Sequence, residues 1–215
     1  MEGEQRDVQG KEDLIRPHGG YRKLRSFQTA QLVYDLTVVF CSRFVDKRSR
    51  THDQMVQAAR SGVQNIAEGS MASGTSKKME LKLTGVARAS LEELLLDYED
   101  FLRQRGLRIW GKESPEALAV RRKYQSDGSD RSDKSDKSDR SGGSDKSDKS
   151  DRSDPYCVAT ASPEEAANTI ICLINQASFL LGRQLKKLEQ SFLAEGGFTE
   201  RLYRKRHERR GNPPD

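Results

Sequence analysis

The chain has 215 residues, of which 33% are charged and 33% hydrophobic, and its formal net charge at pH 7 is +5. This balance predicts one small hydrophobic core beside segments that do not pack. No stretch approaches the roughly 18 consecutive apolar residues of a membrane span, and the polar N-terminus is unlike a secretory signal. We therefore expect a cytoplasmic protein with no membrane partner, in which the three cysteines are reduced.

The first expected helix follows a polar segment, residues 1–20, that we expect to be flexible because proline and glycine interrupt it. Apolar side chains recur every three or four residues from Phe27 to Phe44, which is typical of one helical face. The start of this helix is made basic by Arg22, Lys23 and Arg25.

The second and third expected helices form the centre of the chain. Thr51 and Gln54 match a Ser/Thr-x-x-Glu/Gln capping box, which places the start of the second helix at Thr51. Gly62 lies in mid-helix, where glycine costs about 1 kcal/mol, and we interpret it as a point of close approach between helices. The third helix carries a broad apolar stripe and is predicted to end at Gly106.

Short motifs in these helices carry a family resemblance. They are residues 59–61 (Ala-Arg-Ser), 65–69 (Asn-Ile-Ala-Glu-Gly) and 87–94 (Ala-Arg-Ala-Ser-Leu-Glu-Glu-Leu), together with the opening 21–24 (Tyr-Arg-Lys-Leu). Over residues 21–105 the chain resembles a bacterial four-helix-bundle family. That family includes ribosomal-RNA intervening-sequence proteins and the accessory variability proteins of diversity-generating retroelements.

The resemblance implies a homo-oligomer, a ring of five, that binds nucleic acid and a reverse transcriptase. Residues 197–204 are similar to a suffix found on a subset of the family. Ala89 stands where the family often has glycine, a departure that affects only the tightest helix contact.

Five polar residues belong to the motifs: Asn65, Glu68, Arg88, Ser90 and Glu92. We favour a structural polar network, in which Glu68 and Arg88 pair across neighbouring helices and fix their register. The alternative is that these side chains line an oligomer contact or a partner groove.

A low-complexity insertion follows the third helix. Ser114 and Pro115 would first open a short helix that ends at residues 121–123. Residues 126–155 then mostly repeat Ser-Asp-Lys or Ser-Asp-Arg, and we expect disorder because such a tract cannot bury enough apolar area. A phosphorylatable or metal-gathering linker is the alternative, against which the mixed charges argue.

The fourth expected helix lies within residues 156–196. Ser162, Pro163 and Glu165 form a second start signal, and Gly196 stops the helix. Four amphipathic helices without strand-like alternation predict an all-α fold, an antiparallel four-helix bundle in which residues 21–125 supply the first three helices.

Residues 197–215 form a basic tail with interleaved aromatic side chains. Its basic residues are Arg201, Arg204, Lys205, Arg206, Arg209 and Arg210. Such a segment suits phosphate binding with base stacking, and it equally suits a solvated charged tail, so both interpretations stay open.

No residue pattern is typical of an enzyme or a metal site. None of the three histidines has the Glu-x-x-His spacing of a di-iron bundle, and no glycine loop continues into Lys-Ser/Thr after a strand. Cys41 and Cys172 fall on apolar faces, where a small buried hydrophobe is the expected role. We expect no catalytic residue, metal or cofactor.

The sequence therefore predicts a non-enzymatic, oligomeric helical protein. It would bind nucleic acid through basic surfaces in a salt-sensitive way, as an accessory factor to a reverse transcriptase or another RNA- or DNA-processing partner. The alternative is a protein-only oligomeric scaffold or adaptor.

Overall fold

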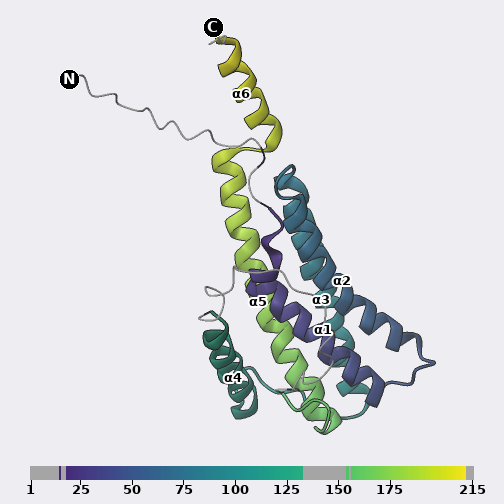
Figure 1. Ribbon diagram of the computed structural model, residues 1–215. Coiled ribbons are helices and arrows are strands. Elements are labelled where there is room, and N and C mark those ends of the chain that lie inside the picture. The colour runs from purple at the N-terminus through teal and green to yellow at the C-terminus, as the bar shows by residue number, and fades with distance from the viewer. Residues whose placement is uncertain (1–14, 16–17, 133–153, 155, 212–215) are drawn as a thin grey trace, which may run out of the picture.

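A computed structural model of the chain describes residues 15, 18–132, 154 and 156–211. Its regular elements are a 3-10 helix, η1 (Gly20–Lys23), and the α-helices α1 (Arg25–Phe44), α2 (Arg50–Ala72), α3 (Lys77–Gln104), α4 (Pro115–Ser132), α5 (Pro163–Glu195) and α6 (Phe198–Gly211) (Figure 1). The described part of the chain contains no strand, which confirms the all-α expectation.

Four helices enclose the hydrophobic core. α1 and α3 each pack against both α2 and α5, and α4 lies on the outside against α5 (Figure 1). The largest fully buried side chains include Phe40 and Val33 of α1, Met55 and Ile66 of α2, Tyr98, Leu91 and Leu94 of α3, and Ile170, Ile174 and Leu181 of α5. None of the helices in the described residues has the length and apolarity needed to cross a bilayer.

The contact between α2 and α3 is close at Gly62. A Cβ atom at this position would lie 2.9 Å from Leu91 Cδ2 and 3.7 Å from the backbone oxygen of Ala87. The expected close approach is confirmed, because a larger residue would have to displace a leucine of the core.

Three of the predicted helix boundaries can be compared with hydrogen bonds. At α5, Glu165 N–H donates to Ser162 Oγ at 3.2 Å and Ser162 N–H donates to Glu165 Oε2 at 3.1 Å, so the capping box is confirmed. At α2 the predicted capping box is wrong, because Ser49 is the cap and its Oγ accepts from Thr51 N–H at 3.2 Å. Ser49 and Thr51 are both suitable cap residues at the end of the polar link before α2, and the turn that precedes the helix selects the earlier one.

Gly106 ends α3 as predicted. It has φ 63°, and its N–H donates to the Arg103 oxygen at 3.2 Å while Leu107 N–H donates to the Leu102 oxygen at 2.9 Å. This pair of bonds is a Schellman motif, which uses glycine because the left-handed conformation penalises a Cβ.

α4 is longer than predicted and reaches Ser132, beyond the end expected at residues 121–123. Its middle is anchored by Tyr124, whose hydroxyl lies 2.6 Å from Thr29 Oγ1 and whose ring centroid lies 5.2 Å from the Arg25 guanidinium carbon. Extension of an anchored helix costs little once the first turn exists.

Most of the expected disordered insertion, 133–153 and residue 155, lies outside the described residues, as do residues 1–14, 16–17 and 212–215.

The connections around α4 are tied to the core by two polar side chains. Asn168, 1% exposed, accepts from Trp110 N–H at 2.7 Å and donates to the Arg108 and Glu164 oxygens at 2.8 and 2.9 Å. Arg43 donates to the backbone oxygens of Val158 and Ala161. These contacts close the end of the molecule at which α1 and α3 finish and α5 begins.

Candidate nucleic-acid interface

The start of α1 presents three cations to solvent. Arg22 and Lys23 lie in the last turn of η1 and Arg25 is the first residue of α1, and all three side chains are exposed. The Arg22 guanidinium carbon lies 5.3 Å from the centroid of the Tyr21 ring, a cation–π contact. None of the three forms an ion pair within the described residues, so their charge is available to an anion.

α3 is divided by charge along its length. Residues 77–88 contain four basic side chains and one acidic side chain: Lys77, Lys78, Lys82, Arg88 and Glu80. Residues 92–105 contain five acidic and two basic ones: Glu92, Glu93, Asp97, Glu99, Asp100, Arg103 and Arg105. The basic half begins beside η1, and the acidic half runs toward the closed end of the molecule.

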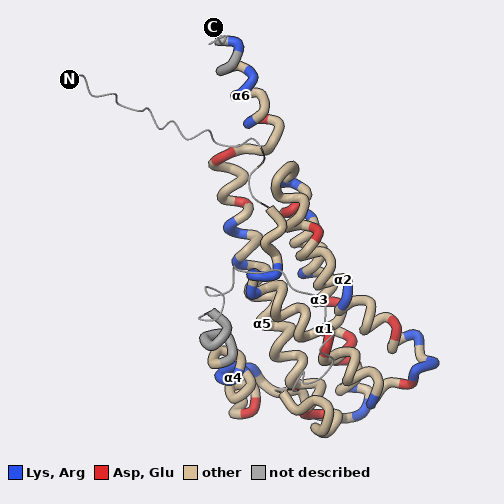
Figure 2. Tube along the Cα trace, in the orientation of Figure 1, with Lys and Arg blue, Asp and Glu red and all other residues tan. Residues whose placement is uncertain are grey.

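The second half of α5 adds cations on the side of the basic half of α3. After Leu181 α5 has no buried residue, and the exposed Arg183, Lys186 and Lys187 lie along it. We term the end formed by η1, residues 77–88, residues 182–195 and α6 the basic end. Figure 2 shows the Lys and Arg positions of this end on α6 and on the adjoining stretch of α5.

α6 arranges the tail residues on a helix that continues beyond α5. Gly196, at φ 71°, breaks α5, and Gly197 N–H donates to Glu200 Oε2 at 2.6 Å at the start of α6. Arg204 donates back to the Glu195 oxygen at 2.8 Å. These bonds fix the turn between the two helices.

The cations of α6 differ in exposure. Arg204, Arg206 and Arg210 are exposed, whereas Lys205 and Arg201 are half-buried. Arg201 Nε and Nη1 have no hydrogen-bond partner in the described part of the chain. The side chain of Arg209 is outside what the structure describes.

Two aromatic rings of α6 lie one turn apart. The Tyr203 and His207 rings stack with centroids 6.2 Å apart and an interplanar angle of 10°, and both residues are exposed. A flat aromatic surface beside arginines is the arrangement on which unpaired bases stack.

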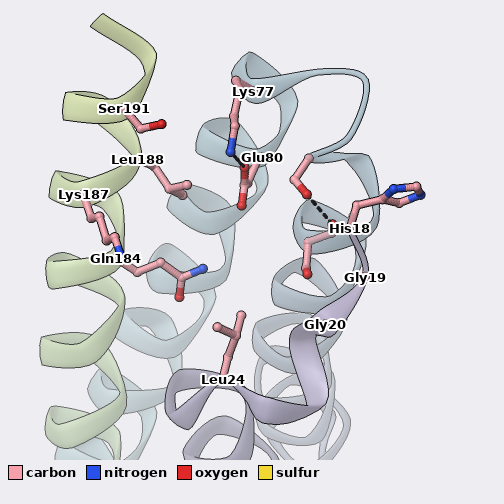
Figure 3. A pocket seen from close by; sticks show the side chains of 12 residues that line it. His18, Gly19, Gly20, Leu24, Lys77, Glu80, Gln184, Lys187, Leu188 and Ser191 are labelled. Carbon is pink, nitrogen blue, oxygen red and sulfur yellow. Dashed lines mark hydrogen bonds and ion pairs between the residues drawn. The ribbon is translucent and has the colours of Figure 1, made fainter. Parts of the chain in front are cut away.

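A cleft of about 330 Å³ lies at the base of the basic end, between η1, the α2–α3 turn and α5 (Figure 3). Lys77 and Glu80 form one wall and are paired at 3.1 Å, so the positive charge of this wall is neutralised. Gln184 in the opposite wall accepts from Ser26 Oγ at 2.7 Å, and Lys187 reaches the rim. The cleft is therefore nearly neutral, and most of the cations lie around it.

The motif polar residues are only partly brought together. Asn65 Nδ2 donates to Ser61 Oγ at 3.1 Å, and Ser61 Oγ lies 2.9 Å from Ser90 Oγ, so α2 and α3 share a short polar chain. Glu68 and Arg88 are exposed and the structure records no ion pair between them in the residues it describes. Glu92 is likewise exposed.

Sequence reasoning missed the residues that tie the connections and helices together. Asn168 and Arg43 clamp the two connections, and Tyr98 donates to Thr37 Oγ1 at 3.1 Å in the core. A polar residue inside an otherwise apolar stripe, as Asn168 is, would have been the available signal.

The buried thiols and carboxylates do not combine into a recognisable site. Burial raises the pKa of the Cys41 thiol to about 12, with a smaller contribution from Asp97, which disfavours the thiolate that nucleophilic chemistry requires. Burial also raises the pKa of Cys172. Within the described residues no three His, Cys, Asp or Glu side chains are grouped closely enough to hold a metal ion.

Comparisons of the chain with models of protein families, with curated proteins and with solved structures find no match.

Proposed function

We propose that the protein is a non-enzymatic helical protein that binds nucleic acid through its basic end. The observation that carries this proposal is the concentration of exposed cations from η1, α5 and α6 at one end of the molecule, beside the stacked Tyr203 and His207. Such a surface attracts a polyanion, and the rings suit its unpaired bases.

The length of the surface favours a polymer over a small anion. The 14 residues of α6 span about 21 Å, at 1.5 Å per residue. One strand of a duplex carries a phosphate about every 3.4 Å, so this helix alone would face on the order of six phosphates. The nearly neutral cleft does not provide the concentrated charge that a single phosphate would require.

The finer parts of the proposal come from the sequence. The four core helices would form an antiparallel bundle. The cysteine pattern supports a cytoplasmic protein, and the motif resemblance supports one that associates with copies of itself and assists a reverse transcriptase or another RNA- or DNA-processing enzyme.

A protein-only scaffold is the second candidate. It is favoured by large apolar side chains exposed on helix surfaces, among them Leu96 at 57% and Phe179 at 61%. A scaffold would use these surfaces and leave the basic end without a specific ligand.

The test is a fluorescence-anisotropy titration of labelled RNA, DNA and hybrid duplex at several salt concentrations. The full chain is compared with a chain that ends at Gly197 and so lacks α6. We expect salt-dependent binding by the full chain and a shallower dependence after truncation, because each lost phosphate contact removes about 0.7 to 0.9 from the slope of log K against log salt concentration.

Absence of binding by either chain at low salt would contradict the proposal and leave the scaffold. Equal salt slopes for both chains would remove α6 from the binding surface.

A further inference from the structure

The outward face of α3 carries an apolar stripe that no described residue covers. Met79, Val86 and Leu96 are 44%, 40% and 57% exposed, and Ala89 between them is also exposed. Two charged residues, Lys82 and Glu93, lie in the same stripe. Successive members of the stripe are alternately three and four residues apart: Met79, Lys82, Val86, Ala89, Glu93 and Leu96. This is the spacing of a coiled-coil seam, which a surface helix does not need for its own core.

The order of residues along this stripe is self-complementary. Read from either end it runs apolar, charged, apolar, apolar, charged, apolar, and the two charges have opposite signs. If a second α3 lies antiparallel and the pair is centred between Ala87 and Arg88, Lys82 of each copy falls opposite Glu93 of the other. In the same register Met79 falls opposite Leu96, and Val86 opposite Ala89.

We propose that this stripe is the contact surface for a second copy of the chain, which docks as a symmetric antiparallel pair through α3. Every contact in such a pair occurs twice, because the symmetry axis makes the surface its own partner. The register is set by the two Lys82–Glu93 pairs, since opposite charges at the seam select the alignment.

Charge complementarity selects this partner over others. The basic residues 77–88 of one copy lie along the acidic residues 92–105 of the other, whereas a nucleic acid would meet the acidic half unfavourably. Neither Lys82 nor Glu93 forms an ion pair within the described part of its own chain. A second α3 helix can also approach closely near the middle of the stripe, because a Cβ placed on Gly85 would meet no heavy atom within 4 Å.

The inference names the surface of the self-association in the proposed function and rests on that part alone, not on nucleic-acid binding. It also differs from the ring of five that the motif resemblance implies, because a symmetric contact closes at two copies.

The test is sedimentation equilibrium of the full chain over a range of concentrations, with circular dichroism to check folding. We expect the mass of two copies for the native chain, at least a tenfold weaker association for Lys82→Glu and for Glu93→Lys, and recovery in the double variant. Recovery is the decisive result, since only a contact between these two positions restores both pairs. Lys78→Glu is the matched control, because Lys78 is exposed outside the stripe and its reversal should leave the mass unchanged.

A single-copy mass at every concentration would overturn the inference, as would a double variant no tighter than either single one. A mass of five copies that neither reversal changes would place the contact elsewhere. Anisotropy titration of the native chain separates this outcome from the proposed function, because the pair can fail while salt-dependent nucleic-acid binding by the native chain persists.

Discussion

The two ends of the molecule are built differently. At the closed end the Phe40 ring packs against Phe44, Tyr98 and Phe101 with centroids 4.8 to 5.1 Å apart, and the connections are clamped by Asn168 and Arg43. At the basic end the cleft opens, α5 has no buried residue after Leu181, and cations face solvent.

The difference separates stability from binding. A substitution at the closed end removes packing or leaves a buried polar group without a partner, which costs stability. A substitution at the basic end removes an exposed charge, which changes stability little and anion binding considerably. Variants at the two ends should therefore have different and non-overlapping effects.

Phe40→Ala should give the largest effect. It removes the ring at the centre of the aromatic cluster and is expected to lower the free energy of unfolding by about 3 to 5 kcal/mol. Urea denaturation followed by circular dichroism measures the loss. Phe179→Ala is the control, since this ring is 61% exposed, and an equal loss in the control would contradict the closed-end account.

Asn168→Ala should have the next largest effect. It leaves Trp110 N–H and the Arg108 oxygen without their buried partner, at a cost of about 1 to 3 kcal/mol. The same denaturation experiment applies, with the exposed Asn175→Ala on α5 as the matched control. A loss no greater than that of Asn175→Ala would show that Asn168 does not hold the closed end.

Asp97→Asn should have a smaller and opposite effect. Burial raises the pKa of Asp97 above its ordinary value of 3.8, with additional contributions from Glu93 and Asp100. The folded state holds the Asp97 proton more tightly than the unfolded state. The free energy of unfolding therefore falls as pH rises above about 4 and Asp97 ionises.

We therefore expect Asp97→Asn to raise the melting temperature at pH 7 and to lose this advantage below about pH 4. Thermal unfolding at several pH values measures both. An advantage that is the same at every pH would show that ionisation of Asp97 is not its origin.

Local signals in the sequence predicted the helices well. The cap at Ser162, the glycine stop at Gly106 and the close approach at Gly62 each depend on a few neighbouring residues, and the structure confirms all three. The error at Thr51 is of the same local kind, because two possible caps lie two residues apart and the preceding turn decides between them.

Long-range relations were harder to predict. Glu68 and Arg88 were expected to pair because they lie on neighbouring helices, yet both are exposed with no ion pair between them in the described residues, and Ser61, Asn65 and Ser90 meet instead. Which side chains meet depends on the rotation of each helix about its axis. That rotation is set by the whole core and is not encoded in any one motif.

The basic end could be predicted in part. The sequence predicted the basic residues near Arg22 and those of the tail as candidate binding residues. It did not indicate their neighbours on α3 and α5, because the basic and acidic halves of α3 nearly cancel when the charge is summed over the whole helix. Only the fold places residues 77–88 beside η1 and the second half of α5.

The most direct test compares the salt dependence of RNA binding between two matched triple variants of the full chain. Arg22→Ala/Lys23→Ala/Arg25→Ala removes three exposed cations at the basic end, and Lys47→Ala/Arg48→Ala/Arg50→Ala removes three exposed cations at the closed end. We predict that the first variant binds on the order of tenfold more weakly with a shallower salt slope, while the second matches the native chain. Equal losses in both variants would contradict a localised binding surface.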